Sequence, residues 1–435
     1  MKLVTFVLII VCLLVFALGC SNDNQDTLSR VIALEDALKD TENIIVDLEN
    51  DLLDANNALA SLDDELRGAN RKIRDLEDDL TSFQEEKATS DFVKLFLPND
   101  YLLTSGDTFQ LFFRSIIQAV NPYHYYIRLS GTVGHLYQRY YEWTPQASDI
   151  GKSFPLTIDI CDNQGTVLES QTTTLKVGAP SGSQTSRTVL CVGDSLTANG
   201  YWISYGYQKY LSNGGAPINF VGSLSSGYQT TVHHEGREGW QWSSFVGSYG
   251  DTPSPFNPTG GSFSFLDYAT SLGYSQSDEL YVLLTWNGIG GSFRNFSFYT
   301  QPFLGAKTFI DTFHEEFPNA KITLMGIPQP SVHSGLGAYY TINQSYGDNY
   351  GQFVTALYYN EFLKEWADHE NYASFMRYID VKGQFDSEYN MPLVPKAVNT
   401  QSSTTESIGS AMGMHPTTSG YLQIGDAFYR ALSHD

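Results

Sequence analysis

Residues 188–197 read Thr-Val-Leu-Cys-Val-Gly-Asp-Ser-Leu-Thr, an apolar run that ends in a glycine and a serine. A short apolar run of this kind is typical of a strand that is buried on both faces. Gly193 permits a tight turn after the strand, and Ser195 then lies near the start of a helix, where free N–H groups favour negative charge. The stretch therefore predicts a strand–turn–helix unit with an exposed hydroxyl at its turn.

Further β-type runs follow this strand and are separated by helical stretches. The expected strands are residues 218–221, 280–284, 321–326 and 376–381, and the most evident helices are 304–317 and 353–369. This alternation predicts an α/β domain over residues 187–435, with a parallel sheet of five strands covered on both faces. In such sheets the active site lies at the carboxyl ends of the strands, where Ser195 is expected.

Three later motifs fall after other strands or before the last helix. Gly239 lies in Glu-Gly-Arg-Glu-Gly-Trp (235–240), and a glycine there lets a backbone N–H approach a reacting oxygen. Asn287 ends the third strand, and His415 precedes the C-terminal helix as a plausible general base. Each motif alone fits a turn or a structural residue equally well. Their order of Ser, Gly, Asn and His favours one shared site.

That order resembles the SGNH hydrolase family, also called the GDSL esterases and lipases, over residues 187–435. The resemblance implies a flavodoxin-like three-layer α/β/α domain that hydrolyses esters without a cofactor or metal. It implies Ser195 as nucleophile and His415 as base. The oxyanion hole would consist of the N–H groups of Ser195 and Gly239 and the side-chain amide of Asn287.

The sequence departs from the family pattern at the acid that orients the histidine, because Met412 stands where the family has an aspartate. Three outcomes stay open. Another acid reaches His415, with Glu406, Asp386 and Asp380 as candidates. Alternatively, a backbone carbonyl orients the ring and leaves a Ser-His dyad, or the domain has lost catalysis and only binds.

Residues 1–20 have the pattern of an export signal: Lys2, an apolar run over 3–18, and Ala-Leu-Gly-Cys at 17–20. This resembles a bacterial lipobox, which implies that Cys20 is acylated. An uncleaved membrane anchor is the alternative. Both interpretations predict an exported, membrane-tethered chain at the cell surface or in the periplasm.

Residues 21–90 carry 19 acidic and 7 basic residues, and apolar residues recur there at alternating spacings of three and four. This heptad pattern predicts a parallel coiled-coil stalk, and hence a homo-oligomer, either a dimer or a trimer. One helix of a globular bundle is the alternative, but no other helical hairpin follows. The whole chain has a net charge of −23, which argues against a nucleic-acid partner.

Residues 91–180 show short β-type runs and turn signals, which predict a small antiparallel β-sandwich of immunoglobulin-like type. Its many aromatic residues suggest either a carbohydrate-binding face or ordinary core packing. Residues 181–186 are expected to be a linker. Cys161 and Cys191 are expected to be buried and unbridged, and no metal-ligand spacing appears.

These features together predict an exported serine esterase that acts on O-acyl groups, with O-acetyl esters of carbohydrate as the favoured substrate. The alternative is a catalytically degenerate surface protein that binds glycans or acts as an adhesin. Hydrolysis of an aryl acetate that depends on Ser195 distinguishes the two.

Overall fold

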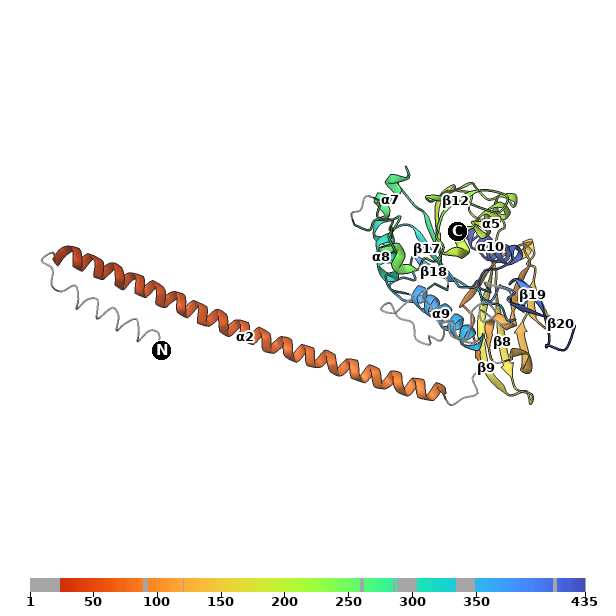
Figure 1. Cartoon of the computed structure of the whole chain (residues 1–435), viewed down its shortest axis with the longest axis horizontal. Helices are drawn as coiled ribbons and strands as arrows, with labels where there is room; N and C mark the ends of the chain where they lie inside the picture. Colours follow the sequence, from red (N-terminus) through yellow and green to blue (C-terminus); the bar gives the residue numbers. More distant parts are fainter. Residues whose placement is uncertain are drawn as a thin grey trace. The chain divides into compact units, whose positions relative to one another are not determined.

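The computed structural model describes residues 24–88, 93–119, 121–258, 262–284, 286–287, 303–333, 349–409 and 413–434 (Figure 1). The chain divides into two compact units, Met1–Asp91 and Phe92–Asp435. The predicted signal segment, including Cys20, lies outside the described residues. Across the described ranges, no helix combines the length and the hydrophobicity needed to cross a bilayer.

The N-terminal unit contains one helix of 65 residues, α2 (Asn24–Ala88). Its sequence has no proline and a single glycine, Gly68, so nothing in it interrupts the ladder of backbone hydrogen bonds. Leucines of the heptad seam are largely exposed in the single chain, at 60% for Leu48, 63% for Leu52 and 68% for Leu59. A second copy of the chain would bury them in a coiled coil, which stays a prediction.

Residues 93–178, which we call the β-domain, form a four-stranded and a three-stranded sheet around a shared apolar core, together with a two-stranded pair of Lys94–Leu95 and Ile117–Gln118. The four-stranded sheet has the order β2 (Asp100–Thr104), β9 (Val167–Gly178), β8 (Ser153–Cys161) and β5 (Tyr126–Gly131). The three-stranded sheet has the order β3 (Phe109–Phe112), β7 (Tyr140–Trp143) and β6 (His135–Leu136). We expected antiparallel pairing throughout. Instead β2 joins β9 in parallel, which is possible because a long stretch of chain connects the two strands.

The C-terminal α/β domain is built on a mixed sheet of seven strands, two more than expected. Its main path runs β12 (Leu224–Ser226), β13 (Val232–Gly236), β10 (Arg187–Gly193), β16 (Glu279–Leu283), β17 (Lys321–Met325) and β18 (Met376–Ile379), and β11 (Ile218–Val221) also pairs with β10. All pairs are parallel except β12 with β13. Strand β13 was not predicted, because its sequence is largely polar.

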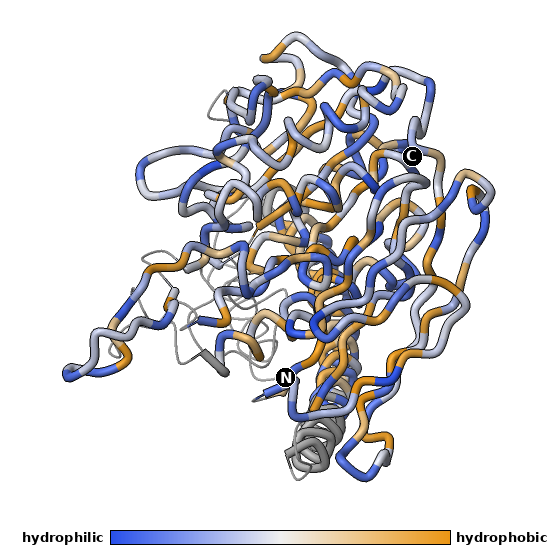
Figure 2. The backbone as a smooth tube through the Cα atoms, turned by 90° about the vertical axis from the view of Figure 1, so that its right-hand side faces the viewer, coloured by the Kyte–Doolittle hydropathy of each residue, from blue (hydrophilic) through white to orange (hydrophobic). Residues whose placement is uncertain are grey.

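Helices cover both faces of this sheet. Alternate residues of one strand enter different cores: Val189 and Cys191 pack with one cluster, and Leu190 and Val192 with the other. The first face is covered by α5 (Tyr201–Ser212) and α10 (Thr418–Leu432). The second is covered by α6 (Trp242–Val246), α7 (Phe265–Ser271), α8 (Ala306–Glu316) and α9 (Asn349–Asp368). In Figure 2, orange hydrophobic stretches of the backbone lie in the interior of the second unit.

Short elements complete the second unit. They are β1 (Lys94–Leu95), α3 (Phe113–Ile116), β4 (Ile117–Gln118), η1 (Pro122–His124), η2 (Ala147–Asp149), α4 (Ser195–Ala198), β14 (Ser248–Tyr249), β15 (Thr252–Pro253), β19 (Leu393–Ala397) and β20 (Thr405–Gly409). Cys161 and Cys191 are buried and free, as expected.

The β-domain and the α/β domain belong to one compact unit and share buried polar contacts. Arg430 of α10 bonds Asp107 of the β-domain at 2.7 Å and the carbonyl of Thr108 at 2.8 Å. The segment between the domains also accepts hydrogen bonds, since the Tyr210 hydroxyl donates to the carbonyl of Ser183 at 2.7 Å. The β-domain is thus packed against the α/β domain and is not joined to it by the connecting segment alone.

Candidate active site

Ser195 lies at the carboxyl end of the central strand β10, as the first residue of α4. Its N–H is therefore one of the donors that a helix leaves free. Asp194 precedes it as the N-cap, and its Oδ1 accepts from the N–H of Leu196 at 3.0 Å. A Cβ added to Gly193 would lie 2.1 Å from Thr197 Oγ1 and 2.4 Å from the carbonyl oxygen of Leu283, so only glycine fits this turn.

His415 meets Ser195 across 220 residues of sequence: its Nε2 lies 2.8 Å from Ser195 Oγ. The histidine stands two residues before Thr417, the N-cap of α10. Burial lowers the pKa of His415, and the negative charge of Glu238 partly opposes that shift. The imidazole is therefore neutral near pH 7 and able to accept a proton from the hydroxyl.

The structure does not bring the three expected acids to His415. Asp380 accepts from the Tyr101 hydroxyl at 2.6 Å, and Asp386 pairs with Arg139 at 2.7 Å. Glu406 lies exposed on β20. Among the residues that the structure describes, no group bonds the buried Nδ1 of His415. Met412 and its two preceding neighbours lie outside the described residues.

Glu238 is the carboxylate whose charge reaches His415, and the sequence reasoning missed it. It stands directly before Gly239, in the loop that follows β13. The clue to Glu238 in the sequence was its position next to Gly239, the expected oxyanion donor. Pattern analysis could not use it, because 177 residues separate Glu238 from His415 along the chain.

The other two expected oxyanion residues lie next to the Ser195 turn. Gly239 has a φ of +80°, and an added Cβ would lie 2.6 Å from the Tyr249 hydroxyl. The N–H of Arg237 donates to the carbonyl of Gly193 at 2.8 Å, which attaches the loop to the end of β10. Asn287 Nδ2 donates to the carbonyl of Trp240 at 3.1 Å, so the same loop is held at both ends.

Asn287 also joins the loop to the nucleophile turn, because its Nδ2 lies 3.3 Å from Asp194 Oδ2. One amide therefore contacts the backbone after β13 and the residue before Ser195. Its neighbours Thr285 and Gly288 lie outside the described residues. The Ser, Gly, Asn and His motifs of the sequence thus converge on one end of the sheet.

Among the described residues, His234 of β13 makes structural contacts only. His234 is buried, with Nε2 at 2.6 Å from Ser226 Oγ and Nδ1 accepting from the N–H of Gly236 at 3.0 Å. Burial lowers its pKa to about 4. Within the described ranges, no three His, Cys, Asp or Glu side chains gather in a group able to hold a metal ion.

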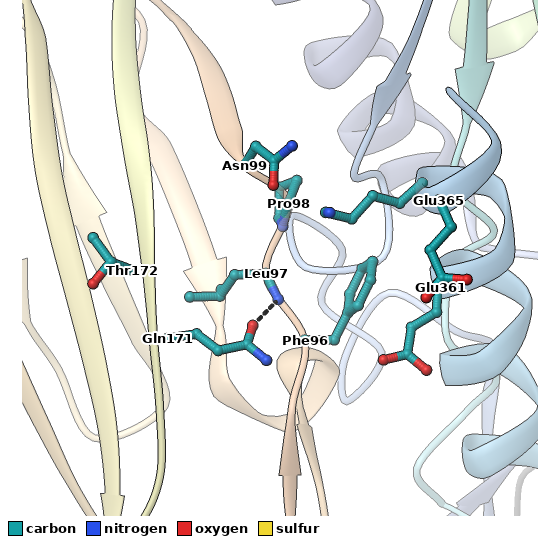
Figure 3. A pocket seen from close by; sticks show the side chains of 9 residues that line it. Phe96, Leu97, Pro98, Asn99, Gln171, Thr172, Glu361 and Glu365 are labelled. Carbon is teal, nitrogen blue, oxygen red and sulfur yellow. Dashed lines mark hydrogen bonds between the residues drawn. The ribbon is translucent and has the colours of Figure 1, made fainter. Parts of the chain in front are cut away.

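A separate open cavity of about 290 Å³ lies between the β-domain and α9 (Figure 3). Its polar lining includes Gln171, whose Oε1 accepts from the N–H of Leu97 at 3.0 Å, and the α9 carboxylates Glu361 and Glu365. Neither Ser195 nor His415 lines it, so this cavity is distinct from the Ser-His site.

Comparison with known proteins finds similar solved structures only at low identity. No model of a protein family and no curated protein matches the chain. A GDSL-like lipase from Parabacteroides merdae is 13% identical over 57% of this chain and 96% of its own, with a TM-score of 0.31. An extracellular lipase from Streptomyces rimosus is 13% identical over 55% and 97%, with a TM-score of 0.31.

A third similar structure is phospholipase A1 from Streptomyces albidoflavus, 14% identical over 55% of this chain and 98% of its own, with a TM-score of 0.28. The structures similar to this chain thus include GDSL-like lipases, the group whose motifs residues 187–435 resemble.

Proposed function

We propose that this protein is a serine esterase. Ser195 Oγ attacks the carbonyl carbon of an ester while His415 Nε2 takes the hydroxyl proton. The proton then passes to the leaving alcohol, and water releases the acyl group from Ser195 by the same route. The observation that carries this proposal is the 2.8 Å contact between Nε2 and Oγ at the carboxyl end of a central parallel strand.

The negative oxygen of the tetrahedral intermediate would be held by the N–H groups of Ser195 and Gly239 and by the Asn287 amide. The positive φ of Gly239 and the bonds of Asn287 to the nucleophile turn support this arrangement. We further propose a Ser-His dyad, in which the charge of Glu238 stabilises the imidazolium in place of a bonded acid.

The substrate that we propose is an O-acylated carbohydrate, with acetyl as the favoured acyl group. Tyrosines of the β-domain support it, because Tyr123, Tyr126 and Tyr137 are 38%, 59% and 44% exposed and flat rings stack on sugars. We also propose that lipid on Cys20 tethers the chain outside the cell and that α2 joins several copies. Nucleic acid is not a partner in this proposal.

The test is hydrolysis of an aryl acetate, followed by acetate release from a panel of acetylated glycans, by the full chain. Ser195→Ala and His415→Ala are each expected to lower kcat/KM by at least about 10⁴-fold. Ser130→Ala and His135→Ala, at exposed positions of β5 and β6, serve as controls that keep wild-type rates. Equal rates for Ser195→Ala and wild type would overturn the esterase. Glycan binding by an inactive wild type would instead identify a glycan-binding surface protein.

A further inference from the structure

The β-domain reaches the candidate active site through a short turn, residues 386–390, that packs against the start of α10. We propose that Arg139 of the β-domain is a positioning residue for His415 and acts through this turn. The inference rests on the proposed esterase function. It assigns the β-domain a role in catalysis besides any role in binding.

Arg139 forms ion pairs with two carboxylates of the turn. Its Nη2 lies 2.7 Å from Asp386 Oδ1, and its Nε lies 2.7 Å from Glu388 Oε2. The Tyr123 hydroxyl adds a bond of 3.0 Å to Glu388 Oε2. A planar guanidinium that spans two acceptors fixes direction as well as distance. The β-domain therefore holds the turn in one orientation.

Asp386 shapes the turn that Arg139 holds. Its Oδ1 also accepts from the N–H groups of Glu388 and Tyr389, at 3.1 and 3.3 Å. One oxygen thus closes the turn and receives the guanidinium. This explains why Asp386, a candidate acid in the sequence, is unavailable to His415.

The turn in turn supports the backbone next to His415. The carbonyl of Asn390 accepts from the N–H of Thr417 at 2.9 Å and from its Oγ1 at 3.1 Å. A Cβ added to Gly420 would lie 2.6 Å both from the Asn390 oxygen and from Pro416 Cβ. The packing of Asn390 against the start of α10 leaves no free space. A shift of Asn390 must therefore move Thr417, which is two residues from His415.

Support of the backbone next to His415 matters more in this site than in a site where an acid holds the imidazole ring by a hydrogen bond. Among the described residues, His415 Nδ1 has no hydrogen-bond partner, and Ser195 Oγ contacts the ring at Nε2. With no acid at Nδ1, the backbone on which the histidine stands carries more of the ring's orientation. The path from Arg139 through Asp386 and Asn390 to Thr417 holds that backbone.

The β-domain has other bonds to the same segment, which should keep an Arg139 variant folded. The N–H of Phe112 donates to the carbonyl of Gly383 at 2.8 Å, and Ser115 Oγ donates to the carbonyl of Phe385 at 2.8 Å. Loss of the guanidinium is therefore expected to loosen the turn without releasing the domain.

The experiment compares Arg139→Met with Arg128→Met in the full chain, by aryl acetate hydrolysis. Arg128 is a matched control because its Nε and Nη2 bond Asp159 at 2.9 and 2.7 Å within the β-domain sheet. We expect Arg139→Met to lower kcat about 10-fold with KM within about twofold, since small misplacements of reacting groups are costly. Arg139→Lys should recover part of kcat, and Arg128→Met should match wild type.

A second variant allows the inference to be tested even if Arg139→Met fails to fold. Asp386→Asn keeps the shape of the side chain but removes its charge, so it should lower kcat with KM unchanged. Its effect should not add to that of Arg139→Met, because both act on one turn. Wild-type kcat in either variant would overturn the inference. A wild-type chain whose rate equals that of Ser195→Ala would instead remove the esterase, and the inference with it.

Discussion

His415 combines a buried ring, a contact with Ser195 and a neighbouring charge on Glu238. Burial disfavours the imidazolium, which lowers the pKa of His415 and keeps it a free base at neutral pH. In the proposed mechanism the imidazolium needs a counter-charge, and we expect Glu238 to supply one without a hydrogen bond. Sequence motifs pointed to Ser195 and His415, which lie in contact, whereas among the described residues none of the three acids suggested from the sequence bonds His415 Nδ1.

The pH dependence of hydrolysis tests this arrangement. Because His415 must be neutral to act, kcat/KM should rise with pH through the lowered pKa of His415 and level off at a lower pH than an unperturbed histidine would give. Glu238 raises that pKa, so Glu238→Gln should move the acidic limb to lower pH. It should also lower the plateau by about 2- to 5-fold, the scale of an exposed charge interaction.

The control is Glu370→Gln, another exposed glutamate that is remote from the site in sequence. It is expected to leave the profile unchanged. An acidic limb that moves to higher pH in Glu238→Gln would contradict the assigned role, because removing a negative charge cannot favour the imidazolium.

At the scale of elements, the turn between β10 and α4 determines where Ser195, the proposed nucleophile, lies. The strand was predictable, since its apolar run is continuous, and so was the glycine turn. Strands β12 and β13 were not predicted, because short polar segments pair only when a neighbouring strand offers its edge. Their pairing places Gly236 beside Gly193 and so brings the Gly239 loop to the site.

A glycine substitution tests the tightness of this turn. Gly193→Ala would force a Cβ to within 2.4 Å of the Leu283 carbonyl, so we expect a loss of about 1–3 kcal/mol in the free energy of unfolding. Gly247→Ala is the control, since its nearest atom is 3.3 Å away and its φ is −130°. Urea titration measures both, and equal stability of the two variants would contradict the geometry.

At the scale of the whole molecule, α2 carries an exposed apolar seam, which we predict to be covered by other copies of the chain. Leu48 and Leu52 lie on the predicted seam, whereas Val46 and Leu53 lie beside it and are similarly exposed, at 54% and 59%. Each leucine buried in a coiled coil contributes about 1.5–3 kcal/mol. Several leucines of this kind occur along the 65 residues of α2, so their combined burial should hold a parallel oligomer together.

We expect the double change Leu48→Lys and Leu52→Lys to reduce the molar mass of the full chain to that of a monomer. The matched pair Val46→Lys and Leu53→Lys should leave the oligomer intact. Light scattering after size-exclusion chromatography measures both masses. If the two variants share one mass, the seam is not where the copies meet.

The sequence by itself determined the long helix, five of the seven sheet strands and the main helices of residues 187–435, and the Ser, Gly, Asn and His motifs. These depend on local periodicity and on residue types that stay recognisable without contacts. Only the tertiary structure decided which acids face His415 and that Arg139 supports its backbone. The reason is that a carboxylate acts on a base through space, at distances set by packing between segments far apart in the chain.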